Sequence, residues 1–124
     1  MTSADRTRVA DVMSTPLRTI TPDATVREAA TEMRAHDISA LLVTTAPPSI
    51  VTSSDVLDAI AAGDDADDVL VSDVMTESVE TVPPDLVLQE VAAMMTCFEV
   101  KHLPVAEDDY LGMVSSTDVT DDAA

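Results

Sequence analysis

The sequence predicts a mixed α/β (α+β) fold built from two copies of one structural unit. Three observations support this prediction: an internal repeat, the same order of strand and helix patterns in both copies, and enough apolar residues for a packed core. Hydrophobic residues make up 46% of the 124-residue chain, and only 2% are aromatic. Aliphatic side chains and methionine must therefore fill the core. One copy alone would bury too little surface to be stable.

The repeat consists of matched residues separated by a constant number of positions. Val9–Met13 recurs as Val71–Met75, an offset of 62, and twelve of the thirty-five pairs that start at positions 9 to 43 are identical. Near the end of each copy the offset is 63, where Val51–Val56 matches Val114–Val119. A one-residue difference in a loop explains this step. We therefore expect a duplication, with one repeat at residues 1–62, an acidic linker at 63–70 and a second repeat at 71–124.

Each copy shows the pattern strand, helix, strand, strand, helix. Short β-type runs at 17–20 and 79–82 precede prolines, and apolar residues at helical spacing follow at 26–33 and 88–95. Further strands are expected at 40–44 and 103–106, and at 50–51 and 111–114. A helix should follow each hairpin, where a hydroxyl of Ser53 or Ser116 is placed to cap it. Gly63 suits the end of the first of these helices.

The charge of the chain excludes several classes of partner. The formal net charge is −18, with 24 acidic residues against six basic ones. Binding to nucleic acid or to an anionic membrane depends on basic residues, so we expect neither. The chain has no apolar run long enough to span a membrane and no signal pattern, which predicts a cytoplasmic protein. The acidic composition is similar to that of salt-loving archaea, where salt screens the repulsion; an acidic partner-binding face is the alternative.

The sequence contains no pattern of an enzyme or a metal site. The single cysteine, Cys97, excludes an internal disulfide and a zinc site, and its apolar neighbours predict a buried structural thiol. With two glycines in total, the chain has no glycine-rich phosphate loop, and it has neither an H-E-x-x-H motif nor a calcium loop. We therefore expect no catalytic activity, no required cofactor and no defined metal site.

The motifs that open and close each copy carry a family resemblance. D-V-M stands at 11–13 and 73–75, and the closing segments are Thr52–Asp55 and Ser115–Asp118, with His102-Leu103-Pro104-Val105 before the second. Together they resemble paired CBS domains, named after cystathionine β-synthase, over residues 9–119. The resemblance implies two β-α-β-β-α repeats packed with pseudo-two-fold symmetry. It implies a regulatory, non-enzymatic module that binds AMP, ADP, ATP or an S-adenosyl ligand such as S-adenosylmethionine.

The resemblance also implies a homodimer that regulates an unidentified protein in another chain. The alternative is a ligand-free structural or dimerisation module whose pockets are vestigial.

The chemistry of an adenosyl site can be stated from the residue types. A carboxylate accepts hydrogen bonds from ribose hydroxyls, a serine or threonine hydroxyl reaches a phosphate, and a helix N-terminus offers N–H groups to an anion. By the resemblance, each pocket combines the closing segment of one repeat with the early strand and hairpin of the other. Pocket A would comprise Thr52, Ser54, Asp55, Val79, Val100, Lys101 and His102. Pocket B would comprise Thr15, Leu17, Ile38, Ser39, Ala40, Ser115, Thr117 and Asp118.

The two pockets are not equivalent in charge. Pocket A would contain Lys101, the only lysine in the chain, beside His102. Pocket B has Ser39 and Ala40 at the matching positions, with Arg18 the nearest candidate cation. We expect pocket A to favour phosphorylated ligands, and pocket B to be empty or to hold a less anionic ligand.

The two key acids also have a structural interpretation. Asp55 and Asp118 stand at expected helix starts, where a carboxylate interacts favourably with the helix dipole. The first repeat departs from the second at its hairpin, with Ser49 in place of Gly112 and Leu42 in place of Pro104. This hairpin could reshape one pocket wall.

Overall fold

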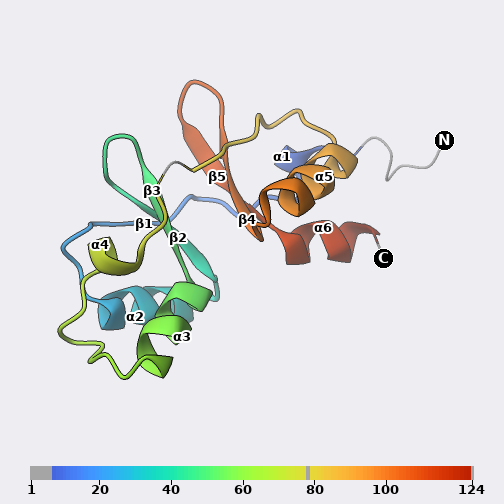
Figure 1. Cartoon of the computed structure of the whole chain (residues 1–124). Helices are drawn as coiled ribbons and strands as arrows, with labels where there is room; N and C mark the ends of the chain where they lie inside the picture. The colour runs from blue at the N-terminus through green and yellow to red at the C-terminus, as the bar shows by residue number, and fades with distance from the viewer. Residues whose placement is uncertain (1–6, 78, 124) are drawn as a thin grey trace. The chain divides into compact units, whose positions relative to one another are not determined.

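The computed structural model describes residues 7–77 and 79–123, which form two compact units (Figure 1). The first-repeat unit is Arg18–Val79, and the second-repeat unit is Met1–Leu17 together with Glu80–Ala124. Both units are mixed α/β, as the sequence predicts. The predicted boundaries divide the chain between consecutive repeats. In the structure, the first residues of each repeat pack with the rest of the other repeat.

A three-stranded sheet forms the centre of the first-repeat unit. Its order is β1 (Thr19–Ile20), β2 (Ala40–Val43) and β3 (Ser49–Thr52), with β1 parallel and β3 antiparallel to β2. Three helices complete the unit: α2 (Val26–His36), α3 (Ser53–Ala61) and α4 (Val71–Val74). The buried core is aliphatic apart from one methionine, as the composition predicts, and consists of Ala24, Ala29, Met33, Leu41, Val43, Val51 and Val71.

The second-repeat unit contains the hairpin of β4 (His102–Ala106) and β5 (Tyr110–Ser115). Its helices are α1 (Val9–Val12), α5 (Leu88–Phe98) and α6 (Ser116–Ala123), and Figure 1 shows α1 beside α5. The core comprises Val9, Val82, Leu88, Val91, Met95, Leu103, Val105 and Val114. Both units show the predicted order of strand, helix, strand, strand and helix, except that the strand expected at 79–82 is not formed. The structure also contains two short helices, α1 and α4, that the sequence did not predict.

The strand expected at 79–82 is reduced to a single parallel bridge between Val82 and Val105. In the first repeat, the Leu42 amide donates to the Arg18 carbonyl at 3.1 Å and extends the pairing. Pro104 occupies the position that matches Leu42, and proline has no N–H to donate. The parallel pairing is therefore shorter in the second repeat.

The short helices that end at the D-V-M motifs are exchanged between the repeats. In the first-repeat unit, the Val71 amide of α4 donates to the Ala24 carbonyl at 2.8 Å. In the second-repeat unit, the Val9 amide of α1 donates to the Leu86 carbonyl at 2.9 Å. Val9 and Val71 are both fully buried. Each repeat therefore supplies one apolar side chain and one helical turn to the core of the other.

The helix ends differ from the prediction at two points. Thr52 and Ser115, rather than Ser53 and Ser116, supply the capping hydroxyls, because each helix begins one residue earlier than expected, at Ser53 and at Ser116. Gly63 follows α3 with φ +88°, the left-handed conformation that favours glycine, as predicted.

Cys97 is exposed, so the prediction of a buried thiol is wrong. The buried side of α5 contains Val91 and Met95, and a residue two positions after Met95 lies on the opposite face of the helix. None of the helices in the described part of the chain has the length and apolar character needed to cross a membrane.

Candidate functional site

The open end of the β2–β3 hairpin brings together several of the residues that the sequence predicts for the site. Ala40 at the start of β2 pairs with Thr52 at the end of β3. The Ser53 amide, the first of α3, donates to the Ser39 carbonyl at 2.9 Å. Ser39, Ala40 and the Thr52–Asp55 segment therefore lie at one end of the hairpin, at the start of α3.

A reciprocal set of hydrogen bonds fixes the Asp55 carboxylate at this helix start. Asp55 Oδ2 accepts from the Thr52 amide at 2.8 Å and from Thr52 Oγ1 at 3.1 Å. The Asp55 amide donates back to Thr52 Oγ1 at 3.4 Å. This arrangement is a capping box. It confirms the structural interpretation of Asp55, and the ligand role of the same half-buried carboxylate stays a prediction.

The second-repeat unit has the same arrangement at the open end of the β4–β5 hairpin. His102 pairs with Ser115, and the Ser116 amide donates to the Lys101 carbonyl at 2.8 Å. Asp118 Oδ2 accepts from the Ser115 amide at 2.9 Å, and the Asp118 amide donates to Ser115 Oγ at 3.1 Å. The duplication therefore extends to individual hydrogen bonds around both acids.

The N-termini of α3 and α6 offer fewer free N–H groups to an anion than the sequence suggests. The first amide of each helix, at Ser53 and Ser116, donates to a hairpin carbonyl. The third amide, at Asp55 and Asp118, donates to the capping hydroxyl. Only the second amide of each helix has no such partner among the described residues. A phosphate would therefore depend on side chains such as Lys101.

The predicted residues are divided between the two units. Seven lie in the first-repeat unit: Ile38, Ser39, Ala40, Thr52, Ser54, Asp55 and Val79. Eight lie in the second: Thr15, Leu17, Val100, Lys101, His102, Ser115, Thr117 and Asp118. Pockets A and B each draw on both units and remain predictions.

Accessibility varies among these residues. Thr15, Ser54, Lys101 and Thr117 are exposed, Ala40 is buried, and the others are partly buried. The exposed hydroxyls and the lysine amine are thus accessible to a small molecule.

The sequence showed that Ser49 and Gly112 differ between the two hairpins, but it did not indicate the contacts that these residues make. Ser49 is 1% exposed, and its hydroxyl lies 2.7 Å from Thr45 Oγ1. At the matching position in β5, a Cβ on Gly112 would lie 2.6 Å from the Ser14 carbonyl oxygen. The difference between Ser49 and Gly112 at matching positions was visible in the sequence. The structure explains it, because any side chain at position 112 would collide with the Ser14 carbonyl. In the part of the chain that the structure describes, no three metal-ligating side chains cluster.

Comparison with protein families identifies both repeats. The model of the CBS domain matches residues 9–62 and 71–123. The CBS-domain protein ATU1752 from Agrobacterium tumefaciens has a similar structure, with TM-score 0.86 and 28% identity, covering 100% of this chain and 98% of that one. The CBS domain pair of protein MJ0100, in complex with 5′-methylthioadenosine and S-adenosyl-L-methionine, has TM-score 0.81 and 28% identity, covering 93% and 94%.

Two curated relatives are longer than this chain. An uncharacterized protein of Methanopyrus kandleri, MK0525, is 28% identical over 117 residues, which are 90% of this chain and 60% of that protein. Inosine-5′-monophosphate dehydrogenase of Korarchaeum cryptofilum is 34% identical over 105 residues. The match covers 82% of this chain but only 21% of the dehydrogenase. The likeness to the dehydrogenase is thus confined to a small part of that enzyme.

Proposed function

This chain belongs to the CBS domain family, and we propose that it is a regulatory module that binds AMP, ADP, ATP or a related adenosyl ligand. The observation that carries the proposal is the fixed orientation of a carboxylate at both hairpin ends. Asp55 Oδ2 accepts from the amide and the hydroxyl of Thr52, and Asp118 Oδ2 accepts from the Ser115 amide. Such a carboxylate is oriented before a ribose hydroxyl arrives, which lowers the ordering cost of binding. The ligands of the MJ0100 domain pair support the adenosyl class.

The proposed contacts assign one role to each kind of side chain. The Asp55 carboxylate accepts hydrogen bonds from ribose hydroxyls through Oδ1, because the capping hydrogen bonds use Oδ2. Lys101 and His102 contact phosphate oxygens, since most N–H groups at the start of α3 and α6 already have partners. These residues belong to pocket A, which we propose as the site for a phosphorylated ligand. Pocket B, with Asp118, takes a less anionic ligand or none.

Binding is proposed to act through conformation rather than chemistry. A ligand that binds one arrangement of the repeats more tightly shifts the population toward that arrangement. A regulated protein in another chain then responds to the change. We propose that the module assembles as a homodimer in the cytoplasm of a salt-adapted cell, where salt screens the net charge of −18.

One observation favours a second candidate function, a ligand-free structural or dimerisation module. The capping boxes give Asp55 and Asp118 a folding role that needs no ligand. On this hypothesis the acids serve only to start α3 and α6, and no adenosyl compound binds.

Two variants on α3 separate a ribose contact from the cap. Asp55→Asn keeps an oxygen that can accept from the Thr52 amide, but it removes the charge that strengthens hydrogen bonds from ribose. Charged hydrogen bonds contribute about 1.5–3 kcal/mol, so affinity for AMP should fall at least about tenfold. Asp58→Asn makes the same charge change at an exposed position of α3 and should leave affinity unchanged. Titration calorimetry in molar KCl measures both, and equal affinities for the two variants would reject Asp55 as the ribose ligand.

A third variant tests the phosphate contact. Lys101→Met removes the amine while keeping an unbranched apolar side chain. ATP and AMP should bind more weakly, whereas 5′-methylthioadenosine, which has no phosphate, should bind as before. An equal loss for all three ligands would contradict the role given to Lys101.

A further inference from the structure

A groove of about 530 Å³ lies between β1 and α2 in the first-repeat unit. Its strand side consists of residues 19–21, and its helix side includes Glu28 and Glu32. The sheet order is β1-β2-β3, so β1 is an edge strand, and Figure 1 shows it in this unit with α2. Among the described residues, β2 is the one strand that pairs with β1. The groove therefore follows an open edge of the sheet.

Three backbone groups at the end of β1 face this open edge. The Arg18 and Ile20 carbonyls accept hydrogen bonds from β2 at 3.1 and 3.0 Å. In a trans peptide the N–H points opposite to the C=O, so the Thr19 and Thr21 amides point away from β2. The register of the parallel ladder turns the Thr19 carbonyl the same way. None of the residues in 7–77 and 79–123 forms a hydrogen bond with these three groups.

The helix side of the groove is acidic. Glu28 and Glu32 are exposed one turn apart on α2, and Glu32 Oε2 lies 3.3 Å from His36 Nε2. Arg27 is the one basic residue among the described residues that line the groove. It is already paired with Asp67, which raises the pKa of the guanidinium through a hydrogen bond and charge attraction. The groove therefore favours a cationic occupant.

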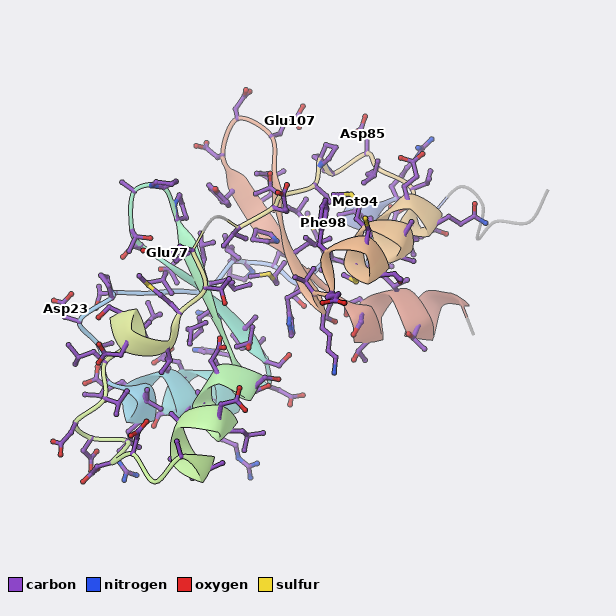
Figure 2. The ribbon with its side chains drawn as sticks, in the orientation of Figure 1. Asp23, Glu77, Asp85, Met94, Phe98 and Glu107 are labelled. Atoms are coloured by element: carbon purple, nitrogen blue, oxygen red, sulfur yellow. The ribbon has the colours of Figure 1, made fainter. Side chains whose placement is uncertain are left out.

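The second repeat lacks this combination at its matching positions. At an offset of 62, Pro83 stands in the place of Thr21 and has no N–H to donate. Met94 takes the place of Glu32, and Figure 2 shows it on α5. Proline is one of the residues that protect the edge of a sheet from pairing with another chain. The open edge and the paired acids are thus specific to the first repeat.

We propose that this groove binds a basic, extended segment of another protein, which adds to β1 as a further strand. Such a strand pairs with the Thr19 N–H, the Thr19 C=O and the Thr21 N–H in either direction, and main-chain hydrogen bonds of this kind provide affinity. The alternate side chains of the added strand provide specificity.

The spacing of the two glutamates defines the sequence of that segment. Because β1 and β2 are parallel, α2 must run back alongside β1. Glu28 and Glu32 are separated by about 6 Å along the helix axis. Every second residue of a strand lies on the same face, at a spacing of about 6.6 Å. The groove therefore fits a segment with lysine or arginine at two positions separated by one residue.

The groove is separate from the candidate ligand site. In the first-repeat unit, site residues such as Ala40 lie at the start of β2, whereas Ile20 is in register with Val43 at its end. The inference rests on the proposed function only for the existence of a regulated protein in another chain, whose basic segment would attach here. It does not depend on the binding of an adenosyl ligand.

Peptide titrations of the intact chain test the proposal. The probe is the labelled peptide T-K-V-K-T with blocked ends, followed by fluorescence anisotropy in molar KCl, where salt weakens general attraction to the net charge. It should bind saturably. Two controls should bind at least about fivefold more weakly: T-E-V-E-T, which reverses the charge, and T-K-V-K-T methylated at every backbone nitrogen, which keeps the charge but removes the donors. No binding of the probe, or equal binding of either control, would overturn the proposal.

Two pairs of variants locate the bound peptide. Glu28→Gln should weaken binding about two- to fivefold, as expected for the loss of one exposed ion pair. Glu90→Gln makes the same charge change at the matching position of α5 and should leave affinity unchanged. Thr21→Pro removes a backbone donor and should weaken binding about threefold or more, whereas Thr21→Val keeps the donor and should bind like the wild type. Equal affinities within the Glu28 and Glu90 pair would overturn the proposal whether or not Thr21→Pro folds, and equal affinities of folded Thr21→Pro and Thr21→Val would do the same.

Amide hydrogen exchange measured by NMR shows where the strand pairs. The peptide should slow exchange at the Thr19 and Thr21 amides and leave Thr81, which matches Thr19 in the second repeat, unchanged. Unchanged exchange at both Thr19 and Thr21 would overturn strand addition. Calorimetry with AMP on the same protein reports the ligand site independently, so the failure of either proposal is distinguishable from the failure of the other.

Discussion

Gly112→Ser places in the second repeat the residue that the first repeat carries at Ser49. Its Cβ would lie 2.6 Å from the Ser14 carbonyl oxygen, 3.1 Å from Met13 Sδ and 3.2 Å from Thr15 Cγ2. The Ser14 carbonyl is backbone and cannot rotate away, so β5 or the segment after α1 must move. That movement strains the two hydrogen bonds between Ser14 and Met113, which are 2.8 and 3.1 Å long.

Overpacking of this kind costs about 1–3 kcal/mol. For a chain of this size the loss corresponds to a fall in Tm of about 4–12 °C. Thermal and urea unfolding in molar KCl measure it. Leu111→Ser, at the neighbouring exposed position in β5, should change the unfolding free energy by less than about 0.5 kcal/mol. If Gly112→Ser unfolds like Leu111→Ser, the segment after α1 does not pack on β5 as described.

Two further predictions concern the helix ends and the net charge. Asp37 and Glu99 end α2 and α5 in the left-handed conformation, with φ 53° and 57°. Because glycine adopts this conformation without strain, Asp37→Gly and Glu99→Gly should each raise the unfolding free energy by about 0.5–1 kcal/mol. Urea titrations measure the change, and a lower unfolding free energy in both variants would contradict the left-handed conformation. With a net charge of −18, lowering KCl from molar to about 0.1 M should lower Tm. The screening length then grows from about 3 Å to about 10 Å, so the acidic side chains repel one another over longer distances. A higher Tm at low salt would contradict this expectation.

Much of the fold could be predicted because its signals are local and occur twice. The apolar spacing of α2 and α5 and the β-type runs of the hairpins are recognisable within short windows. The offset of 62 confirms each interpretation in a second copy. The place of Thr52 in the cap was also available in principle, since a hydroxyl three residues before an acid is the pattern of a capping box.

The rest depends on contacts between distant segments. The exchange of α1 and α4 rests on hydrogen bonds from Val9 to Leu86 and from Val71 to Ala24. No local pattern around D-V-M indicates which repeat such a short helix packs on. The shortened pairing at Val82 follows from the missing N–H of Pro104, which becomes predictable only once the register with the first repeat is known.

For the candidate site, the sequence indicated hydroxyls and an acid at each helix start, and Asp55 and Asp118 lie in the first turns of α3 and α6. It did not indicate that the hairpin carbonyls of Ser39 and Lys101 accept the first helix amides. This geometry moves the proposed phosphate contact from the helix N-terminus to the side chains of Lys101 and His102. The pairing of these residues with Asp55 remains a prediction.

The most direct test of the central claim is calorimetric titration of the intact chain with AMP, ATP and S-adenosylmethionine in molar KCl. The account predicts saturable heat with at least one of them, and a rise in Tm that grows with ligand concentration. Neither heat nor a shift in Tm with any of the three would contradict the ligand-binding function. It would leave the ligand-free structural module as the function of this pair of repeats.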